Sequence, residues 1–238
     1  MRGLLKKLPW WRPHHPVIAA NRAAFKRFDQ SRPLADYSFV VFDTELTGLD
    51  RRQDEIVAIG AVRIDSLQID LAQTFHCYVR PQRLDHTDAT LVHRITPEQL
   101  RHAPPLAEVL PSFIDFVGSD LLVGHCIDLD MSFIHRATTE VYGGTLVNPG
   151  IDTIRLALGY MQVVRGRYEE PGMTSTSYRL EDLSREFDLP LFEAHDALED
   201  ALQTAYLFLF LIKKFRKGGL TTLQELYRAG KPGIMQII

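Results

Sequence analysis

The chain has 238 residues, 45% of them apolar, which is enough to bury one substantial core in a single domain with extensions. Its two cysteines, Cys77 and Cys126, provide neither a disulfide framework nor metal-ligand spacing, and its longest apolar run, 205–212, is far too short to span a membrane. These features argue against a disulfide-rich secreted scaffold and a membrane protein. We expect a soluble, cytoplasmic protein.

The net charge of −3 is unevenly distributed along the chain. Residues 1–36 carry eight Lys or Arg and two Asp, a balance of +6, which leaves −9 on the other 202 residues. A basic arm of this kind can bind nucleic acid or an acidic partner, or it can lie solvated on the body. The acidic body does not exclude a nucleic-acid enzyme, because divalent cations neutralise dense acid clusters.

The predicted elements run from strands to alternating strands and helices. After a basic extension at 1–36 with a helical stretch at 18–28, three closely spaced strands predict an antiparallel meander, at 38–43, 55–65 and 71–79. A short buried strand follows at 121–124. Helices are predicted at 96–104, 104–117, about 127–140, about 151–163, 180–187, 196–216 and about 221–229, with a loop at 165–177. This order predicts a mixed α/β sheet flanked by helices in a domain at 37–216, followed by a C-terminal helix and apolar tail at 217–238.

The stretch VVFDTELTG, residues 40–48, places two acids at the end of a predicted buried strand. Strand side chains alternate between faces, so Asp43 and Glu45 point to the same side, about 7 Å apart along the chain. Two carboxylates placed so close repel each other unless a cation lies between them. These residues alone leave two interpretations open: a metal site, or a strand that ends in a polar turn at Thr47-Gly48.

Further acids stand where helices are predicted to begin. Asp128 and Asp130 fall in the first turn of the helix after the strand at 121–124, where acids are ordinary partners of the helix dipole. Asp152 opens the helix at about 151–163 and is most simply interpreted as its N-cap. Taken singly, these acids indicate structure rather than chemistry.

The segment EAHDALEDA separates structural acids from candidate catalytic residues. Asp196 as N-cap and Glu199 at the third helical position form a capping box. This leaves His195 just outside the helix and Asp200 one turn inside it. Both lie near the same helix end, where they can act together.

Three motifs now stand in a recognisable order: Asp43-x-Glu45, Asp130 at the end of VGHCIDLD, and His195-x-x-x-x-Asp200. In this order and spacing the sequence resembles the DEDDh exonucleases, the DnaQ-like 3′–5′ exonucleases that include the proofreading epsilon subunit of bacterial DNA polymerase III. Supporting similarity lies in DTELTGLD, DEIVAIGAV, LVHRITPEQL, GIDTIRLA and LEDLSREFDLP. The resemblance covers about 38–212 and implies an RNase H-like fold that releases nucleoside 5′-monophosphates from 3′ ends.

The resemblance also implies roles for individual residues. Asp43, Glu45 and Asp200 would ligate two divalent cations, with Asp43 bridging them and Asp130 supporting the second directly or through water. Ligands that are all oxygen suit Mg²⁺ or Mn²⁺. His195 would be the general base, because imidazole titrates near neutral pH. The implied substrate contacts are Thr44, Leu46, Thr47 and His125.

Three positions depart from the family's usual pattern. Cys126 stands where Asn usually follows His125, and a thiol cannot reproduce the donors and acceptors of an amide. Leu129 replaces the usual Phe before the third acid and keeps its packing role. Arg94 stands where Gly is usual in His-Gly-Ile-Thr. None of these positions is an implied metal ligand, so we expect intact activity and leave its fine specificity open.

Several functions remain compatible with the sequence. The first is a metal-dependent exonuclease acting on single-stranded DNA in proofreading or repair; an exoribonuclease or short-oligonucleotide hydrolase is the alternative, because such a metal site does not choose the sugar. A nucleic-acid-binding or partner-tethered module with weak hydrolysis is the second alternative. The expected partners are a nucleic-acid 3′ end, DNA before RNA, and a polymerase or other protein bound through the N-terminal extension or the C-terminal tail. Accessory candidates are the doublets Trp10-Trp11 and His14-His15, the loop residues Arg165, Arg167 and Tyr168, and the apolar tail GIMQII.

Overall fold

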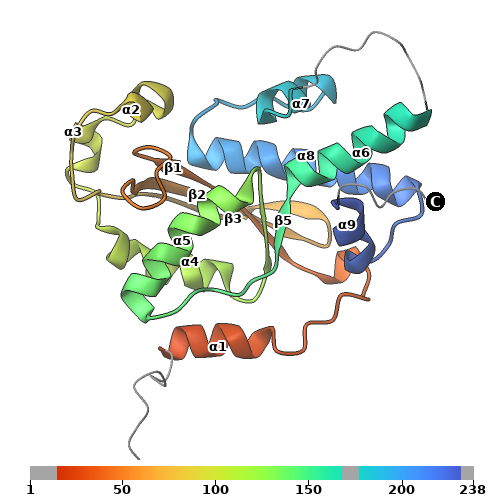
Figure 1. Cartoon of the computed structure of the whole chain (residues 1–238), viewed down its shortest axis with the longest axis horizontal. Coiled ribbons are helices and arrows are strands. Elements are labelled where there is room, and N and C mark those ends of the chain that lie inside the picture. The colour runs from red at the N-terminus through yellow and green to blue at the C-terminus, as the bar shows by residue number, and fades with distance from the viewer. Residues whose placement is uncertain (1–14, 168–176, 232–238) are drawn as a thin grey trace, which may run out of the picture.

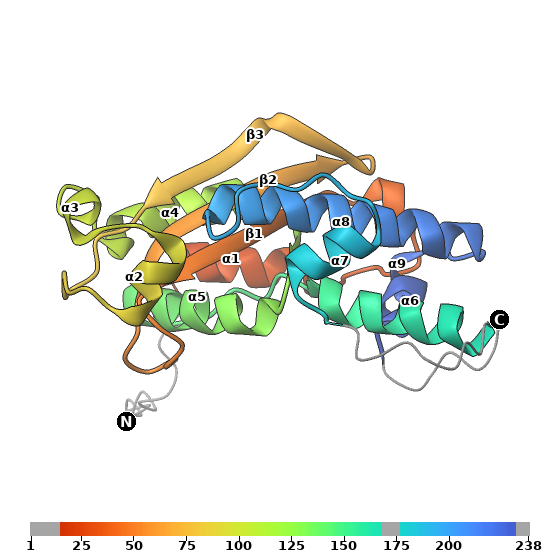
Figure 2. The same cartoon turned by 90° about the horizontal axis from the view of Figure 1, so that it is seen from above.

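A computed structural model describes residues 15–167 and 177–231 of the chain, and its centre is a five-stranded mixed sheet (Figures 1 and 2). The strand order is β3-β2-β1-β4-β5, with β1 antiparallel to β2 and parallel to β4. Strand β2 is also antiparallel to β3, and β4 is parallel to β5. The strands are β1 (Phe39–Leu46), β2 (Ile56–Asp65), β3 (Gln68–Tyr78), β4 (Leu121–Gly124) and β5 (Gly150–Asp152). The predicted meander and mixed sheet are confirmed.

Helices cover both faces of this sheet, so its central strand is buried on both sides. In β1, Phe39 and Val41 pack with Phe208 of α8 (Ala197–Lys217), the long helix drawn in blue in Figure 1. The alternate residues Val40 and Phe42 pack toward the opposite face, against α4 (Leu106–Val117) and α5 (Ile127–Tyr142). The other described helices are α1 (Pro16–Ala24), η1 (Leu34–Asp36), α2 (Asp88–His93), α3 (Pro97–Leu100), α6 (Thr153–Arg167), α7 (Leu180–Glu186) and α9 (Leu223–Ala229).

The structure differs from the predicted elements where local signals are weak. Strand β1 continues through the acids to Leu46, because Thr44 and Glu45 still pair with β2. Strand β3 begins at Gln68, directly after a two-residue turn in which both residues have positive φ, the geometry that matches the twist of a hairpin. Strand β5 and helix α2 were not predicted, and with three and six residues they are too short to show a period.

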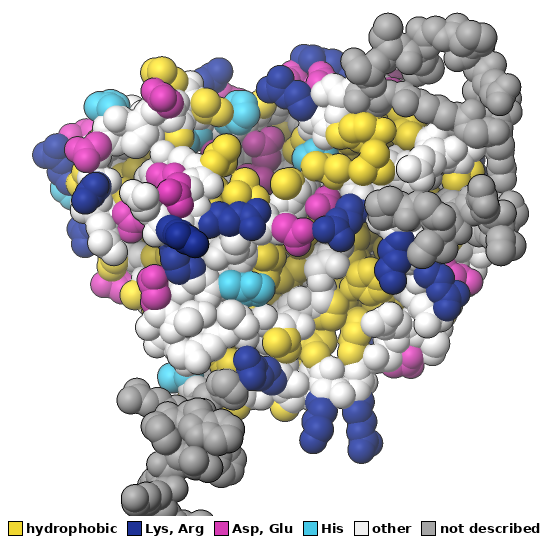
Figure 3. Space-filling model, viewed as in Figure 1, with side chains coloured by type: hydrophobic (Ala, Val, Ile, Leu, Met, Phe, Trp, Pro, Cys, Tyr) yellow, Lys and Arg dark blue, Asp and Glu magenta, His cyan; other side chains and the backbone are white. Residues whose placement is uncertain are grey.

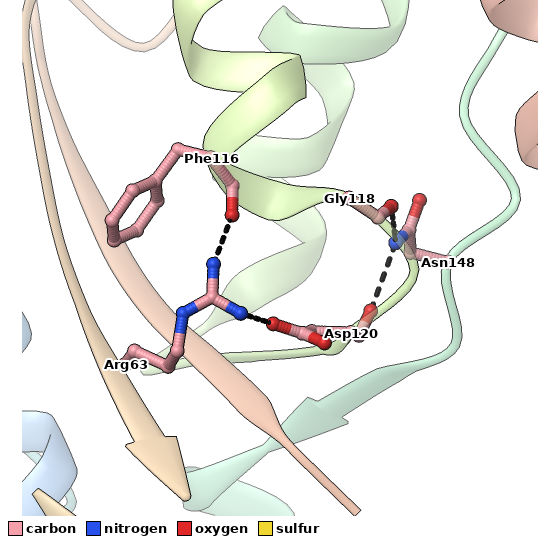
Figure 4. A network of polar contacts seen from close by, with 5 residues as sticks. All are labelled: Arg63, Phe116, Gly118, Asp120 and Asn148. Atoms are coloured by element: carbon pink, nitrogen blue, oxygen red, sulfur yellow. Dashed lines mark hydrogen bonds and ion pairs between the residues drawn. The ribbon is translucent and has the colours of Figure 1, made fainter. Parts of the chain in front are cut away.

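The turn that leads into β4 is fixed by polar contacts (Figure 4). The guanidinium of Arg63, on β2, forms an ion pair with Asp120 and donates to the carbonyl oxygen of Phe116. The Asn148 Nδ2 donates to the carbonyl oxygens of Gly118 and Asp120, at 3.2 and 2.8 Å. The segment that leads into β4 is therefore tied to β2 on the far side of β1.

The described part of the N-terminal extension packs on the body. Ile18 of α1 is fully buried in the core on the α4 and α5 side, and the Asn21 Nδ2 donates to Asn148 Oδ1 at 2.6 Å. The Leu34 N–H donates to the Thr221 carbonyl at 3.0 Å, which joins the extension to the segment before α9. Of the predicted accessory residues, His15 caps α1, while Trp10, Trp11, His14, Tyr168 and the tail GIMQII lie outside the described residues. The predicted division at 36 and 216 stays a prediction.

Among residues 15–167 and 177–231, no helix combines the length and the hydropathy that crossing a membrane requires. Hydrophobic side chains gather in the middle of one face, between α5 and α9 (Figure 3). A cavity of about 580 Å³ lies there along β5, lined in part by Ile127, Met131 and Leu226. This cavity is distinct from the acid cluster described next, since neither Asp43 nor Asp200 lines it.

Candidate active site

Three of the predicted acids come together between β1 and α8. Carboxylate oxygens of Asp43, Glu45 and Asp200 all lie within 4.8 Å of one another. Asp43 and Glu45 follow Phe39 and Val41 on the face of β1 that α8 covers, and Asp200 stands in the first turn of α8. The start of α8 therefore brings a third acid to the two acids that β1 carries.

A glycine on β2 allows α8 to come this close. Gly60 pairs with Asp43 in the register of β1 and β2. A Cβ on Gly60 would lie 2.2 Å from the backbone of Ala197 and of Leu198, at the start of α8. Glycine inside a strand often marks a close backbone approach, and here the approaching backbone is the helix end that carries Asp200.

The start of α8 is fixed by its own side chains. The Asp196 carboxylate accepts the backbone N–H groups of Leu198 and Glu199 at 3.0 and 3.1 Å, so the predicted N-cap is confirmed. Asp200 Oδ2 accepts the backbone N–H of His195 at 2.9 Å. This hydrogen bond places the backbone of His195 directly beside the acid cluster.

Burial and mutual repulsion make these carboxylates weak acids without a cation. Burial first, and then Asp130, Asp200 and Glu45, raise the pKa of Asp43 well above its usual range. Burial first, and then Asp200, raise the pKa of Glu45 to about 8, and burial raises the pKa of Asp200 to about 6. Removing a proton from this cluster is therefore unfavourable unless positive charge is added.

The family's divalent cation fits this donor set, because the ligands on offer are all carboxylate oxygens. Asp130 adds a fourth acid close by. It is buried in the first turn of α5, and its Oδ1 accepts the backbone N–H of Thr44 at 3.1 Å and the Thr44 hydroxyl. Asp130 is not among the three acids within 4.8 Å of one another, so its contact with a cation stays a prediction.

The candidate base His195 lies at the surface and has a left-handed backbone, with φ of 66°. Its neighbour in space is His93, at the end of α2, a residue to which the sequence analysis gave no role. Burial first, and to a smaller degree His195, lower the pKa of His93. The His93 Nδ1 accepts the Ile95 N–H at 3.0 Å, so the neutral ring carries its proton on Nε2.

The four predicted substrate contacts have protein partners of their own. Thr44 and Leu46 are buried, and the Thr44 hydroxyl bonds Asp130. The Thr47 hydroxyl donates to Asp54 at 2.9 Å and accepts the Glu55 N–H.

His125 is engaged at both ring nitrogens. Nε2 donates to the Tyr178 carbonyl at 2.8 Å, and Nδ1 lies 2.8 Å from the Thr153 hydroxyl. Burial lowers the pKa of His125 and so favours the neutral ring. These contacts tie the end of β4 to α6 and to the start of α7, and the predicted contact of His125 with substrate stays a prediction. Asp152 is placed as expected at the start of α6, where its Oδ1 accepts the Ile154 N–H at 2.8 Å.

Two of the three departures from the family pattern fall at left-handed backbone positions. Cys126 has φ of 65° and Arg94 has φ of 59°. The family's usual Asn and Gly are the residues that adopt this conformation most readily, and for other residues it costs about 1–2 kcal/mol. An Asn at position 126 would therefore offer a backbone conformation that suits the turn, in addition to the hydrogen bonds of its amide. The family's usual Gly at position 94 was the sequence signal that could have predicted the left-handed backbone of Arg94.

The fold and the acid cluster are those expected of an exonuclease, and comparison with known proteins assigns the chain to that class. The model of the exonuclease family RNase_T matches residues 40–208, so the chain belongs to this family. The predicted DnaQ-like resemblance, the RNase H-like fold and the enzyme class are thereby confirmed at the level of the family.

Two relatives show how the chain relates to replication proteins. It is 32% identical over 181 residues to the DNA polymerase III subunit epsilon of Aquifex aeolicus, covering 76% of this chain and 83% of that protein. It is 34% identical over 210 residues to the DNA polymerase III PolC-type of Thermotoga maritima, covering 88% of this chain. The chain spans only 14% of the length of that second protein.

Solved structures share the fold. Exonuclease X in complex with 5′ overhanging duplex DNA has a TM-score of 0.59 and 24% identity, covering 81% of this chain and 99% of that one. E. coli Exonuclease I in complex with a dT13 oligonucleotide has a TM-score of 0.63 and 19% identity, covering 81% of this chain and 44% of that one. At these identities the likeness supports the architecture.

Proposed function

We propose that this protein is a metal-dependent 3′–5′ exonuclease that hydrolyses phosphodiester bonds at the 3′ ends of DNA, single-stranded DNA in particular, and releases nucleoside 5′-monophosphates. The observation that carries the proposal is the convergence of Asp43, Glu45 and Asp200 within 4.8 Å, inside the segment that the exonuclease family model matches. The DNA-bound exonucleases with the same fold support DNA as the substrate class.

The residues of the site have separate proposed roles. Asp43, Glu45 and Asp200 would hold two divalent cations, Mg²⁺ or Mn²⁺, with Asp130 supporting one of them. When bound, such cations neutralise charge on the scissile phosphate and favour ionisation of the attacking water. His195 takes the proton of that water on its ring, because it lies beside the acids and is open to solvent. The hydrogen bond from the His195 backbone N–H to the Asp200 carboxylate keeps the proposed base beside a proposed metal ligand.

We also propose a setting for the activity: proofreading or repair in the cytoplasm, alongside a polymerase or another protein. The epsilon and PolC-type relatives support this setting, because both are named as DNA polymerase III components. The basic segment 1–36 and the segment 217–238 are the surfaces proposed to reach such a partner.

The test is digestion of matched DNA and RNA oligonucleotides labelled at the 5′ end, with Mg²⁺, with Mn²⁺ and with chelator. We expect a ladder shortened from the 3′ end, faster on DNA, abolished by chelator and slowed by a 3′-phosphate. Asp43→Ala should lose at least about 10³-fold in rate, the scale of several kcal/mol of transition-state stabilisation. Digestion by Asp43→Ala at the wild-type rate would refute the metal site, and faster digestion of RNA would reverse the substrate assignment.

A further inference from the structure

Arg94 occupies a backbone position that suits glycine. It ends α2 with φ of 59° and ψ of 7°, and its N–H donates to the Thr90 carbonyl. Glycine reaches this conformation without the steric cost that a Cβ imposes. Strained residues of this kind gather at functional sites, where surrounding contacts hold them in place. The contacts of this particular side chain therefore indicate what it does.

The Arg94 side chain reaches across to the loop of the candidate base. Its guanidinium Nη1 lies 3.2 Å from Glu193 Oε1, and Glu193 stands two residues before His195. The paired residues are 99 positions apart in sequence, so the ion pair joins two separate segments. Both side chains are largely exposed, at 74% and 73%. A pair this exposed adds little to global stability, but it is well placed to restrain a surface loop.

The same two segments also meet in the core. Ile95, the residue after Arg94, and Ala197, four residues after Glu193, pack in one small buried cluster with Val57 of β2. His93 interacts electrostatically with His195. Figures 1 and 2 show α2 and α3, in yellow, at the end of the molecule where α8 begins. The buried contacts fix where the segments meet, and the ion pair then restrains the exposed part between Glu193 and His195.

We propose that Arg94 is a positioning residue for His195: through Glu193 it holds the loop of the general base against the end of α2. The proposal rests on the proposed function, since it assigns His195 the proton transfer. Loosening this loop lowers the fraction of molecules in which His195 is in place, and that fraction multiplies the rate. Arg94 acts through Glu193 and need not touch nucleic acid.

A double-mutant cycle on Arg94 and Glu193 tests the proposal. Arg94→Gly and Glu193→Gln should each lower kcat about two- to fivefold, the factor an exposed ion pair can supply, with KM unchanged. The double variant should be no slower than either single variant. The charge-reversed pair Arg94→Glu with Glu193→Arg should recover part of kcat. Arg94→Gly should also raise the melting temperature, because the left-handed backbone is relieved.

Two variants separate this effect from generic ones. Arg101→Gln breaks a comparably exposed ion pair, with Glu98 at 3.0 Å, that does not reach the loop of His195, and kcat should not change. Ser66→Gly relieves a left-handed residue with φ of 49° in the distant hairpin turn, and kcat should again not change. Either control lowering kcat as Arg94→Gly does would overturn the assignment.

Amide hydrogen exchange gives a second readout that needs no nuclease activity. The His195 N–H, which donates to Asp200, should exchange faster in Arg94→Gly and in Glu193→Gln than in the wild type. Unchanged exchange, or a cycle in which the two losses simply add, overturns the proposal. A rise in KM at constant kcat also overturns it, because Arg94 would then contact the substrate. A wild type that digests no 3′ end refutes the proposed function, while the exchange data still decide the link between the two segments.

Discussion

Adding one methyl group at Gly60 should dismantle the active site from a position that bears no functional group. In Gly60→Ala the new Cβ would lie 2.2 Å from the backbone of Ala197 and Leu198. Carbon atoms in contact need about 3.5 Å, so the start of α8 would have to move by roughly 1.3 Å. Neither neighbour can give way by turning a side chain, because both contacts are backbone. Asp200 would move with the helix start.

The expected loss is large in rate and moderate in stability. A misplacement of about 1 Å in a catalytic group costs on the order of 10²-fold, and we expect at least that fall in kcat. Overpacking typically costs about 1–3 kcal/mol, which for a chain of this size lowers the melting temperature by roughly 2–12 °C. Affinity for Mn²⁺ should fall as well, because Asp200 leaves Asp43 and Glu45.

The assay is digestion of a 5′-labelled oligonucleotide well below the melting temperature, beside a thermal unfolding curve. Gly150→Ala is the matched control, because a Cβ on this β5 glycine would lie 3.5 Å from Ile127 Cδ1, an ordinary contact. That variant should keep both rate and stability. Wild-type kcat in Gly60→Ala would refute the argument that β2 sets the position of Asp200.

Three further predictions follow from neighbouring contacts. His195→Ala should lower kcat by about 10²–10⁴-fold at unchanged stability. Asp196→Ala should lose about 1 kcal/mol of stability and keep its rate. If kinetics and thermal unfolding instead showed a stability loss for His195→Ala and a rate loss for Asp196→Ala, the assignment would be wrong. Cys126→Asn should raise stability by about 0.5–1 kcal/mol, since Asn accepts a left-handed backbone more readily, and an unchanged or lower melting temperature would contradict this. Because the folded-state pKa of Glu45 is raised to about 8 and that of Asp200 to about 6, the stability that these groups contribute to the metal-free protein should be complete below about pH 4 and should be lost as pH rises to 8. Saturating Mg²⁺ should remove most of that loss. Urea unfolding at several pH values is the measurement, and a flat profile between about pH 4 and 8 in the metal-free protein would contradict the raised pKa values.

Long, regular elements were predictable from the sequence, and so was the set of acids. The strand that carries Asp43 and the helix that begins at Asp196 have apolar runs long enough to show their period. The order of the four acids was enough to identify the family. The residues that set distances between elements were not predictable in this way, because Gly60 acts on a helix more than 130 positions later in the chain. Arg94 and Glu193 likewise meet only once the fold is formed.

The site therefore combines several locally unfavourable features, and contacts elsewhere in the fold offset their free-energy cost. Acids that repel each other are buried together at β1. Two non-glycine residues, Arg94 and His195, have left-handed backbones. The restraints that offset these costs are the buried packing of Ile95 with Ala197, the Asp196 cap and the contact of α8 with Gly60. Adding cations should offset the electrostatic part alone and leave the backbone part unchanged. Relieving the backbone at Arg94 and filling the site with Mg²⁺ should consequently stabilise the protein additively, because they act on separate causes. If the two gains instead cancel or reinforce each other, the end of α2 and the acid cluster are coupled more tightly than the electrostatic interaction of His93 with His195 accounts for.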